Sequence, residues 1–193
     1  MDDLNSEQTL PPARATRFDR VDDLFREMDK ITAFMTERPA PEEGYRAFFQ
    51  RVRVSQTPED AVTFICFAVE TPEAIQWALD SILDLQPDLS AEDTQLVNWI
   101  AAWLDDQSTE NRWKTMQMAL FAPRKTAIVY LGLAVGWSGG PLAPNDLVSV
   151  PAWRTPRAIS SAVLRAIGQT HADHRCASLN QMMDRAAGLL RVS

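Results

Sequence analysis

The stretch Ala127-Ile128-Val129-Tyr130-Leu131 decides the fold class of this sequence. Its β-branched and aromatic residues suit a strand on propensity alone, but a short apolar run of this kind suits a buried helix equally well. No other stretch of the chain offers a partner strand, and an unpaired strand is not stable by itself. We therefore predict a helix here that runs to about Val135, and an all-α fold.

The neighbouring segments carry helix-start signals. Thr57, Thr71 and Thr155 each precede a proline, and we expect threonine to cap a helix whose first turn holds the proline. Ser90 and Ser108 are expected to cap two more helices. These signals predict helices near 58–69, 72–85, 91–105, 109–121 and 156–167, the last stopped by Gly168, and a final helix near 173–191.

The N-terminal part divides into three pieces. Residues 1–15 are polar and are predicted to form a disordered lead. Apolar residues recur at steps of three and four from Phe18 to Met35, which predicts one amphipathic helix before a shorter helix near 42–53. With a long loop near 136–155, the chain is predicted to form about eight helices, in an irregular bundle or stacked helical hairpins. These make one helical domain over 16–193.

Composition excludes several classes of protein. Apolar residues make up 46% and charged residues 23% of the 193 residues, which is ordinary for a globular protein and unlike collagen or a disordered chain. The longest apolar stretch, 127–137, is shorter than the roughly 20 residues of a membrane span. The acidic N-terminus lacks the features of a secretory signal, and two cysteines make no disulfide framework, so we expect a cytoplasmic protein. Cys66 lies in an apolar run and is expected to be a buried thiol.

Charge is distributed unevenly along the chain. Residues 54–111 hold twelve acidic side chains and no Lys, Arg or His, whereas residues 112–193 hold ten basic and three acidic side chains. One interpretation is internal, with the acidic middle packed beside the basic C-terminal part and several acids serving as helix caps. The other is that part of the acidic surface binds a basic protein partner. The net charge of −7 argues against nucleic acid, because phosphate binding needs a basic surface.

Five residues are the candidate partner-binding residues. Asp84, Asp88, Asp105 and Asp106 lie near the ends of two consecutive predicted helices, where they would form an acidic cluster. Trp137 joins them because tryptophan is enriched at interfaces, although core packing is the commoner role of this residue. Whether the loop around Trp137 is structural or a contact site stays open.

Two further motifs suggest chemistry but fall short of it. Gly136-Trp137-Ser138-Gly139-Gly140-Pro141 lacks the lysine and the preceding strand of a phosphate-binding loop, so we expect a tight turn with positive φ that Trp137 anchors to the core. His171, His174 and Cys176 are spaced so that the histidines share a helix face, but a zinc site needs a fuller ligand set. Asp173 is expected to be a first-turn acid of the last helix, and no catalytic residue, metal or cofactor is predicted.

Several motifs together resemble a known family. Asp60-Ala61-Val62-Thr63-Phe64-Ile65-Cys66 is similar to its Glu-Ala-Val-Trp-Trp-Ala-Cys signature, with departures at Thr63 and Phe64. The stretch 136–144 resembles its Trp-Ser-Gly-Gly-Ser-Leu-Ala-Pro loop, and 108–112 and 155–164 resemble the helix starts on either side of that loop. The family is a proteobacterial domain of unknown function, often encoded near type VI secretion genes, and the resemblance covers roughly residues 55–190.

The resemblance implies a cellular context without implying a reaction. Our first hypothesis is a non-enzymatic adaptor, chaperone or accessory factor of a secretion system, whose acidic face binds a basic partner. The alternatives are an immunity protein that neutralises an effector, and a small metal-binding enzyme that uses His171, His174 and Cys176. The sequence does not predict the oligomeric state.

Overall fold

The computed structural model describes residues 15–142 and 148–190, so the predicted disordered lead lies outside the described residues apart from Ala15. Within these ranges the fold is all-α, as predicted, and extended pairing is confined to the isolated bridges Thr16–Val69 and Pro141–Ser149. The helices are α1 (Val21–Glu27), the 3₁₀ helix η1 (Asp29–Ala33), α2 (Tyr45–Arg53), α3 (Asp60–Ala68), α4 (Thr71–Leu85), α5 (Ala91–Asp105), α6 (Thr109–Phe121), α7 (Ala127–Trp137), α8 (Arg154–Gln169) and α9 (Ala172–Ala187).

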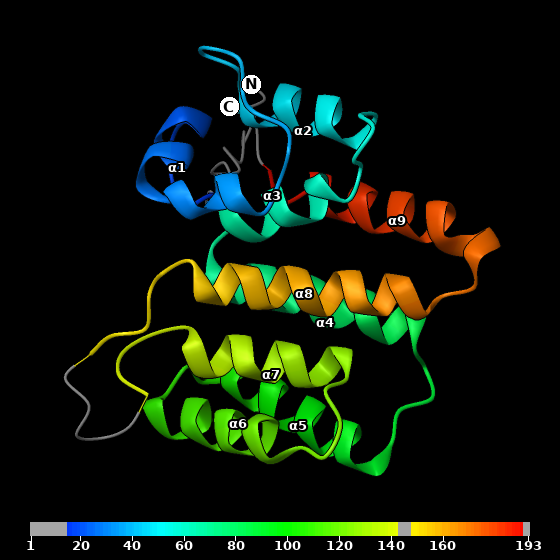
Figure 1. Ribbon diagram of the computed structural model, residues 1–193. Helices are drawn as coiled ribbons and strands as arrows, with labels where there is room; N and C mark the ends of the chain where they lie inside the picture. The colour runs from blue at the N-terminus through cyan, green and yellow to red at the C-terminus, as the bar shows by residue number, and fades with distance from the viewer. Residues whose placement is uncertain (1–14, 143–147, 191–193) are drawn as a thin grey trace, which may run out of the picture.

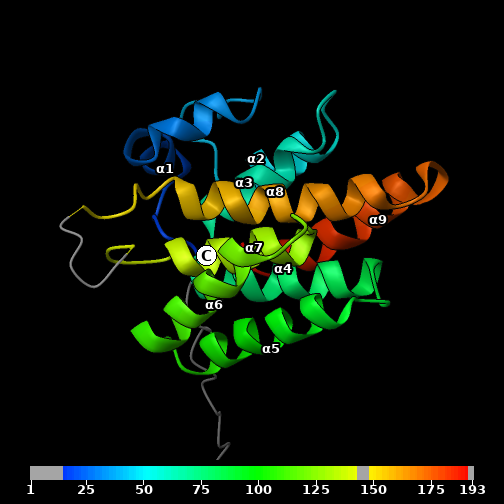
Figure 2. The same cartoon turned by 60° about the horizontal axis from the view of Figure 1, so that its bottom comes forward.

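The helices are arranged around a central pair. In Figure 1, α4 and α8 cross the middle of the molecule, with α5, α6 and α7 on one side and α1, α2, α3 and α9 on the other. Figure 2 brings α5, α6 and α7 toward the viewer. Apart from Met116, the buried apolar side chains of the described residues form one cluster that extends from Ala15 to Leu190, so both sides share a core.

Helix α7 occupies the centre of one side, which explains its apolar sequence. Its residues are buried from Ala127 to Gly136 except for the partly buried Tyr130, because α5, α6, α4 and α8 all pack against it. A helix that is apolar on every face requires neighbours on every face. The prediction of a helix over this ambiguous stretch is confirmed.

The capping predictions are confirmed at serine and wrong at threonine. The hydroxyl oxygens of Ser90 and Ser108 accept hydrogen bonds from the backbone N–H groups of Asp93 and Asn111 and so cap α5 and α6. Thr71 lies inside the first turn of α4, after the cap residue Glu70, and its hydroxyl accepts a hydrogen bond from Arg17.

The other two threonines do not cap either. Thr57 donates its hydroxyl hydrogen to Asp60, and Thr155 is buried within α8. Helices α4 and α8 begin close to the predicted positions because proline fits a first turn, whichever residue precedes it, whereas Pro58 lies just before the start of α3.

The predicted helix from Phe18 to Met35 is interrupted. At Met28 the backbone leaves the helical region, with φ −113° and ψ 51°, and the chain continues as η1. Val21, Leu24, Ile31 and Met35 are buried as the spacing predicted. The step of three from Met28 to Ile31 fits an α-helix and a 3₁₀ helix alike, so it could not reveal the interruption.

Three boundaries in the C-terminal part also differ from the prediction. Gly136 and Trp137 belong to α7, so the long loop begins at Ser138 and not at Gly136. Gly168 does not stop α8, which continues to Gln169; the guanidinium of Arg175 donates hydrogen bonds to the carbonyl oxygens of Gly168 and Thr170 beyond it. Helix α9 ends at Ala187, before the predicted end near 191.

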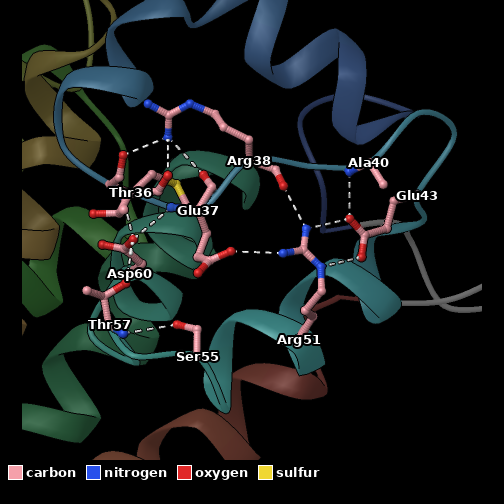
Figure 3. Close-up of polar contacts among 10 residues, drawn as sticks. Thr36, Glu37, Arg38, Ala40, Glu43, Arg51, Ser55, Thr57 and Asp60 are labelled. Atoms are coloured by element: carbon pink, nitrogen blue, oxygen red, sulfur yellow. Dashed lines mark hydrogen bonds and ion pairs between the residues drawn. The ribbon is translucent and has the colours of Figure 1, made fainter.

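A polar network holds the connection between η1 and α2 against α3 (Figure 3). The Asp60 carboxylate accepts hydrogen bonds from the backbone N–H groups of Thr36 and Glu37, at 2.5 and 3.1 Å, and from the Thr57 hydroxyl at 3.1 Å. Arg51 reaches the carboxylates of Glu37 and Glu43 at 2.9 and 2.8 Å. The hydrogen bond from Arg51 also holds the pKa of Glu43 below its usual value.

Replacing Asp60 with asparagine is expected to lower the free energy of unfolding by about 1 kcal/mol. All three donors reach the same carboxylate oxygen, and an amide oxygen accepts more weakly than a charged one. Asp80→Asn is the matched control, because Asp80 is exposed and, among the residues that the structure describes, accepts a hydrogen bond from Gln76 of its own helix alone. Urea unfolding followed by circular dichroism compares the two variants; equal stabilities would contradict the assigned role of Asp60.

Candidate functional site

The acidic segment 54–111 forms α3, α4 and α5, and many of its carboxylates interact within the chain. Asp93 accepts a hydrogen bond from the Thr126 hydroxyl at 2.7 Å, and Glu110 pairs with Lys114 at 2.6 Å. Asp84 on α4 forms an ion pair with Arg185 on α9. The internal interpretation therefore holds for part of the segment, since α9 belongs to the basic C-terminal part.

The four predicted aspartates do not form one cluster. Asp84 and Asp88 lie beside the short connection from α4 to α5, whereas Asp105 and Asp106 lie at the far end of α5. Fifteen residues of helix are about 22 Å long, which separates the two pairs. Asp106 also accepts hydrogen bonds from the Asn111 amide, at 2.9 Å to its carbonyl oxygen and 3.3 Å to its carboxylate.

Trp137 lies apart from the acidic pairs, at the end of α7. Its ring is partly buried and packs against the core, as the anchoring prediction expected. The guanidinium of Arg154 lies 5.9 Å from its ring centre and 5.9 Å from that of Trp153. Of the two glycines that follow, Gly140 has the expected positive φ, at 67°.

Of the four predicted aspartates, Asp84 lines a surface groove between α4 and α9, and the other three do not. The groove has a volume of about 680 Å³ and is lined from α4 by three exposed acidic side chains, Glu73, Asp80 and Asp84. Trp77, Leu83 and Leu189 supply apolar lining. The indole N–H of Trp77 donates a hydrogen bond to the carbonyl oxygen of Met182 at 3.2 Å, which fixes α4 against α9.

This arrangement combines apolar contact with negative charge. We call the surface made by Glu73, Trp77, Asp80, Asp84 and Leu189 the acidic groove. It already holds one cation, because the Arg185 guanidinium pairs with Asp84 within it. Such a groove is suited to a segment that presents both apolar and basic side chains.

Sequence reasoning missed Glu73 and Asp80. Residues 73, 77, 80 and 84 are separated by steps of four, three and four, so they share one face of α4. That spacing was visible in the sequence and is typical of a helix face. The participation of Arg185 and Leu189 from α9 had no sequence signal, because it depends on tertiary packing.

The histidine segment shows no ligand set. His171, His174 and Cys176 are all exposed, and the two imidazole rings lie 6.2 Å apart between centres. Asp173 lies in the first turn of α9 as predicted, with its carboxylate 3.4 Å from His171. In the part of the chain that the structure describes, no three His, Cys, Asp or Glu side chains gather around a point that could hold a metal ion.

The remaining predictions concern burial. Cys66 is fully buried, as expected, and burial raises the pKa of its thiol. Among the described residues, no helix combines the length and apolar character needed to span a membrane.

Fold and site together define an all-α protein with an acidic groove between two helices. The chain belongs to a family of unknown function (DUF6931), which matches residues 48–190. The expectation of a domain of unknown function over roughly 55–190 is confirmed, and α1 and η1 precede the matched region. No curated protein and no solved structure matches the chain.

Proposed function

We propose that this chain is a non-enzymatic protein-binding factor whose acidic groove holds a basic segment of a partner protein. The observation that carries the proposal is the groove itself, where three exposed carboxylates border an apolar lining. Opposite charge speeds encounter and selects the partner, while the apolar lining supplies contact area. The ion pair between Asp84 and Arg185 supports the proposal, because a partner arginine can take the place of Arg185.

The cellular setting of the proposal rests on the resemblance described above. We place the protein in the cytoplasm as an adaptor, chaperone or accessory factor of a type VI secretion system. An acidic groove also suits the alternative, an immunity protein that neutralises a basic effector. Co-expression with a neighbouring effector distinguishes the two, because only an immunity protein rescues growth.

The charge of the groove is tested by reversing two pairs of aspartates. We expect Asp80→Lys with Asp84→Lys to weaken partner binding about tenfold at low salt, because like charges then face the basic segment. Asp105→Lys with Asp106→Lys is the matched control, with the same charge change outside the groove, and is expected to bind nearly as well as the wild type.

The measurement has two stages. Affinity capture from native lysate at low and moderate salt identifies the partner, and titration of the purified partner then gives the dissociation constant of each variant. Unchanged far-UV circular dichroism shows that the variants are folded. Equal affinities for wild type and both variants would contradict an acidic binding surface, and a loss confined to the Asp105 and Asp106 variant would place it elsewhere.

A further inference from the structure

A second and larger groove lies at the other side of the molecule. Its volume is about 880 Å³, and it is formed where the beginning of α5, the end of α6 and the beginning of α7 meet. Leu96, Met118, Ala122 and Val129 supply apolar lining. The acidic groove between α4 and α9 shares no lining residue with it, so the two surfaces are separate.

Two large apolar side chains project beside this groove. Phe121 is 80% exposed and Leu120 is 51% exposed, both in the last turn of α6, and Phe121 also lines the groove. An exposed aromatic side chain next to an apolar groove is typical of an interaction site. The surface therefore offers both a projection and a recess that accepts one.

The charges around this groove are balanced, unlike those of the chain as a whole. Glu92 lines it from α5 and Arg124 from the connection to α7, and both are exposed. Within the chain, hydrogen bonds at its own backbone and with Ser90, and then the attraction of Arg124, lower the pKa of Glu92. Of the neighbouring charges, Asp93 accepts from Thr126, and Lys125 donates to two carbonyl oxygens at the end of α6. With a net charge of −7, two copies repel one another at long range, whereas this locally neutral patch adds no repulsion where they meet.

We propose that a second copy of this chain occupies the groove in a two-fold symmetric dimer. Phe121 of each copy enters the groove of the other, and Glu92 of each copy faces Arg124 of the other. In a two-fold interface the same patch of both copies meets, so the patch must be complementary to itself. A projection then needs a recess within the same patch, and an acidic side chain needs a basic one. This patch carries all four, whereas a strongly acidic or basic partner would leave one of its charges opposed.

The aromatic contact is tested with Phe121→Glu. We expect a dissociation constant of the dimer raised at least thirtyfold, because an aromatic anchor contributes twice to a two-fold interface. Val54→Glu is the matched control: Val54 is 84% exposed, follows α2 far from the groove, and undergoes the same change of charge and polarity. Sedimentation velocity over a concentration series measures the dissociation constant of both variants. Because Phe121 is exposed, we expect its replacement to leave the fold of the monomer unchanged.

The charges are tested by exchanging them. Glu92→Arg and Arg124→Glu are each expected to weaken the dimer about tenfold, and the double variant to restore it, since the exchanged pair is again opposite in sign. A wild-type chain that sediments as a 21.7 kDa monomer at every concentration would overturn the proposal. So would a dimer that survives Phe121→Glu, or one that Val54→Glu dissociates. Partner binding through the acidic groove is measured separately, so either proposal can fail alone.

Discussion

Replacing Gly136 with alanine is expected to lower the free energy of unfolding by about 3 kcal/mol, although alanine is the better helix former. A Cβ atom at this position would lie 2.5 Å from both Cβ and Cγ of Met116 on α6. The Met116 Cβ cannot move without its backbone, so α6 and α7 must separate or distort, and overpacking of this kind is costly. Urea unfolding measures this loss of stability directly, and in a thermal melt we expect the melting temperature to fall by roughly 10 °C.

The same substitution at two other glycines is expected to change the stability by different amounts, which serve as comparisons. At Gly132, one turn earlier, the added Cβ would lie 3.0 Å from Ala119 Cβ and 3.1 Å from a terminal carbon of Leu96, so we expect a cost of about 1 kcal/mol. Gly168 in α8 has nothing within 4 Å of an added Cβ, so Gly168→Ala is expected to stabilise the protein by about 0.5 kcal/mol. Equal stability of the Gly136 and Gly168 variants would contradict the close approach of α6 and α7.

The structure gives residues 136–141, which include the Trp-Ser-Gly-Gly motif, separate structural roles. Gly136 makes room for α6, and the Ser138 hydroxyl donates a hydrogen bond to the carbonyl oxygen of Val135 at 2.7 Å. Gly140 takes the positive φ, and the carbonyl oxygen of Pro141 accepts a hydrogen bond from Arg112. These roles position the loop and hold it in place.

Helix positions were predictable where the signal is local. The segments predicted at 91–105 and 109–121 match α5 and α6 at both ends, because a serine cap and the apolar spacing act within a few residues. The interruption at Met28 was not predictable, because the step of three from Met28 to Ile31 fits either helix type. At Met28, tertiary contacts and not the local sequence pattern determine where the α-helix ends.

The candidate site was predictable only in part. Asp84 of the acidic segment lies in the acidic groove. The prediction that Asp105 and Asp106 lie beside it was wrong, because it ignored the turn between α4 and α5. A short connection sends the next helix back along the first, so the C-terminal ends of consecutive helices lie far apart. The groove itself needed α9, which follows α4 by almost ninety residues in the sequence.

Arg112 shows why some structural residues escape sequence analysis. It is a basic residue in the first turn of α6, where exposure is the usual outcome, yet it is only 6% exposed. Its guanidinium donates hydrogen bonds to the carbonyl oxygens of Gly136 and Pro141, at 2.8 and 3.1 Å. The structure gives it no carboxylate partner among the described residues, and burial lowers its pKa.

Replacing Arg112 with methionine is expected to lower the free energy of unfolding by about 3 kcal/mol. The change removes two charge-assisted hydrogen bonds and leaves the Gly136 carbonyl buried without this donor, while the relief of burying a cation offsets part of the loss. Arg112→Lys is expected to cost about half as much, because an ammonium group lacks the planar fork that reaches both oxygens.

The control for this prediction lies two residues further along α6. Lys114→Met removes an exposed ion pair with Glu110 and is expected to change stability by less than about 0.5 kcal/mol. Urea unfolding compares the three variants. Hydrogen exchange of the Ser138 amide, which donates to the carbonyl oxygen of Val135 at 3.1 Å, is expected to quicken in Arg112→Met and tests whether the start of the loop has lost its support. If Arg112→Met is as stable as Lys114→Met, the guanidinium does not hold the loop, and the loop must be fixed by its own turn geometry and by Trp137.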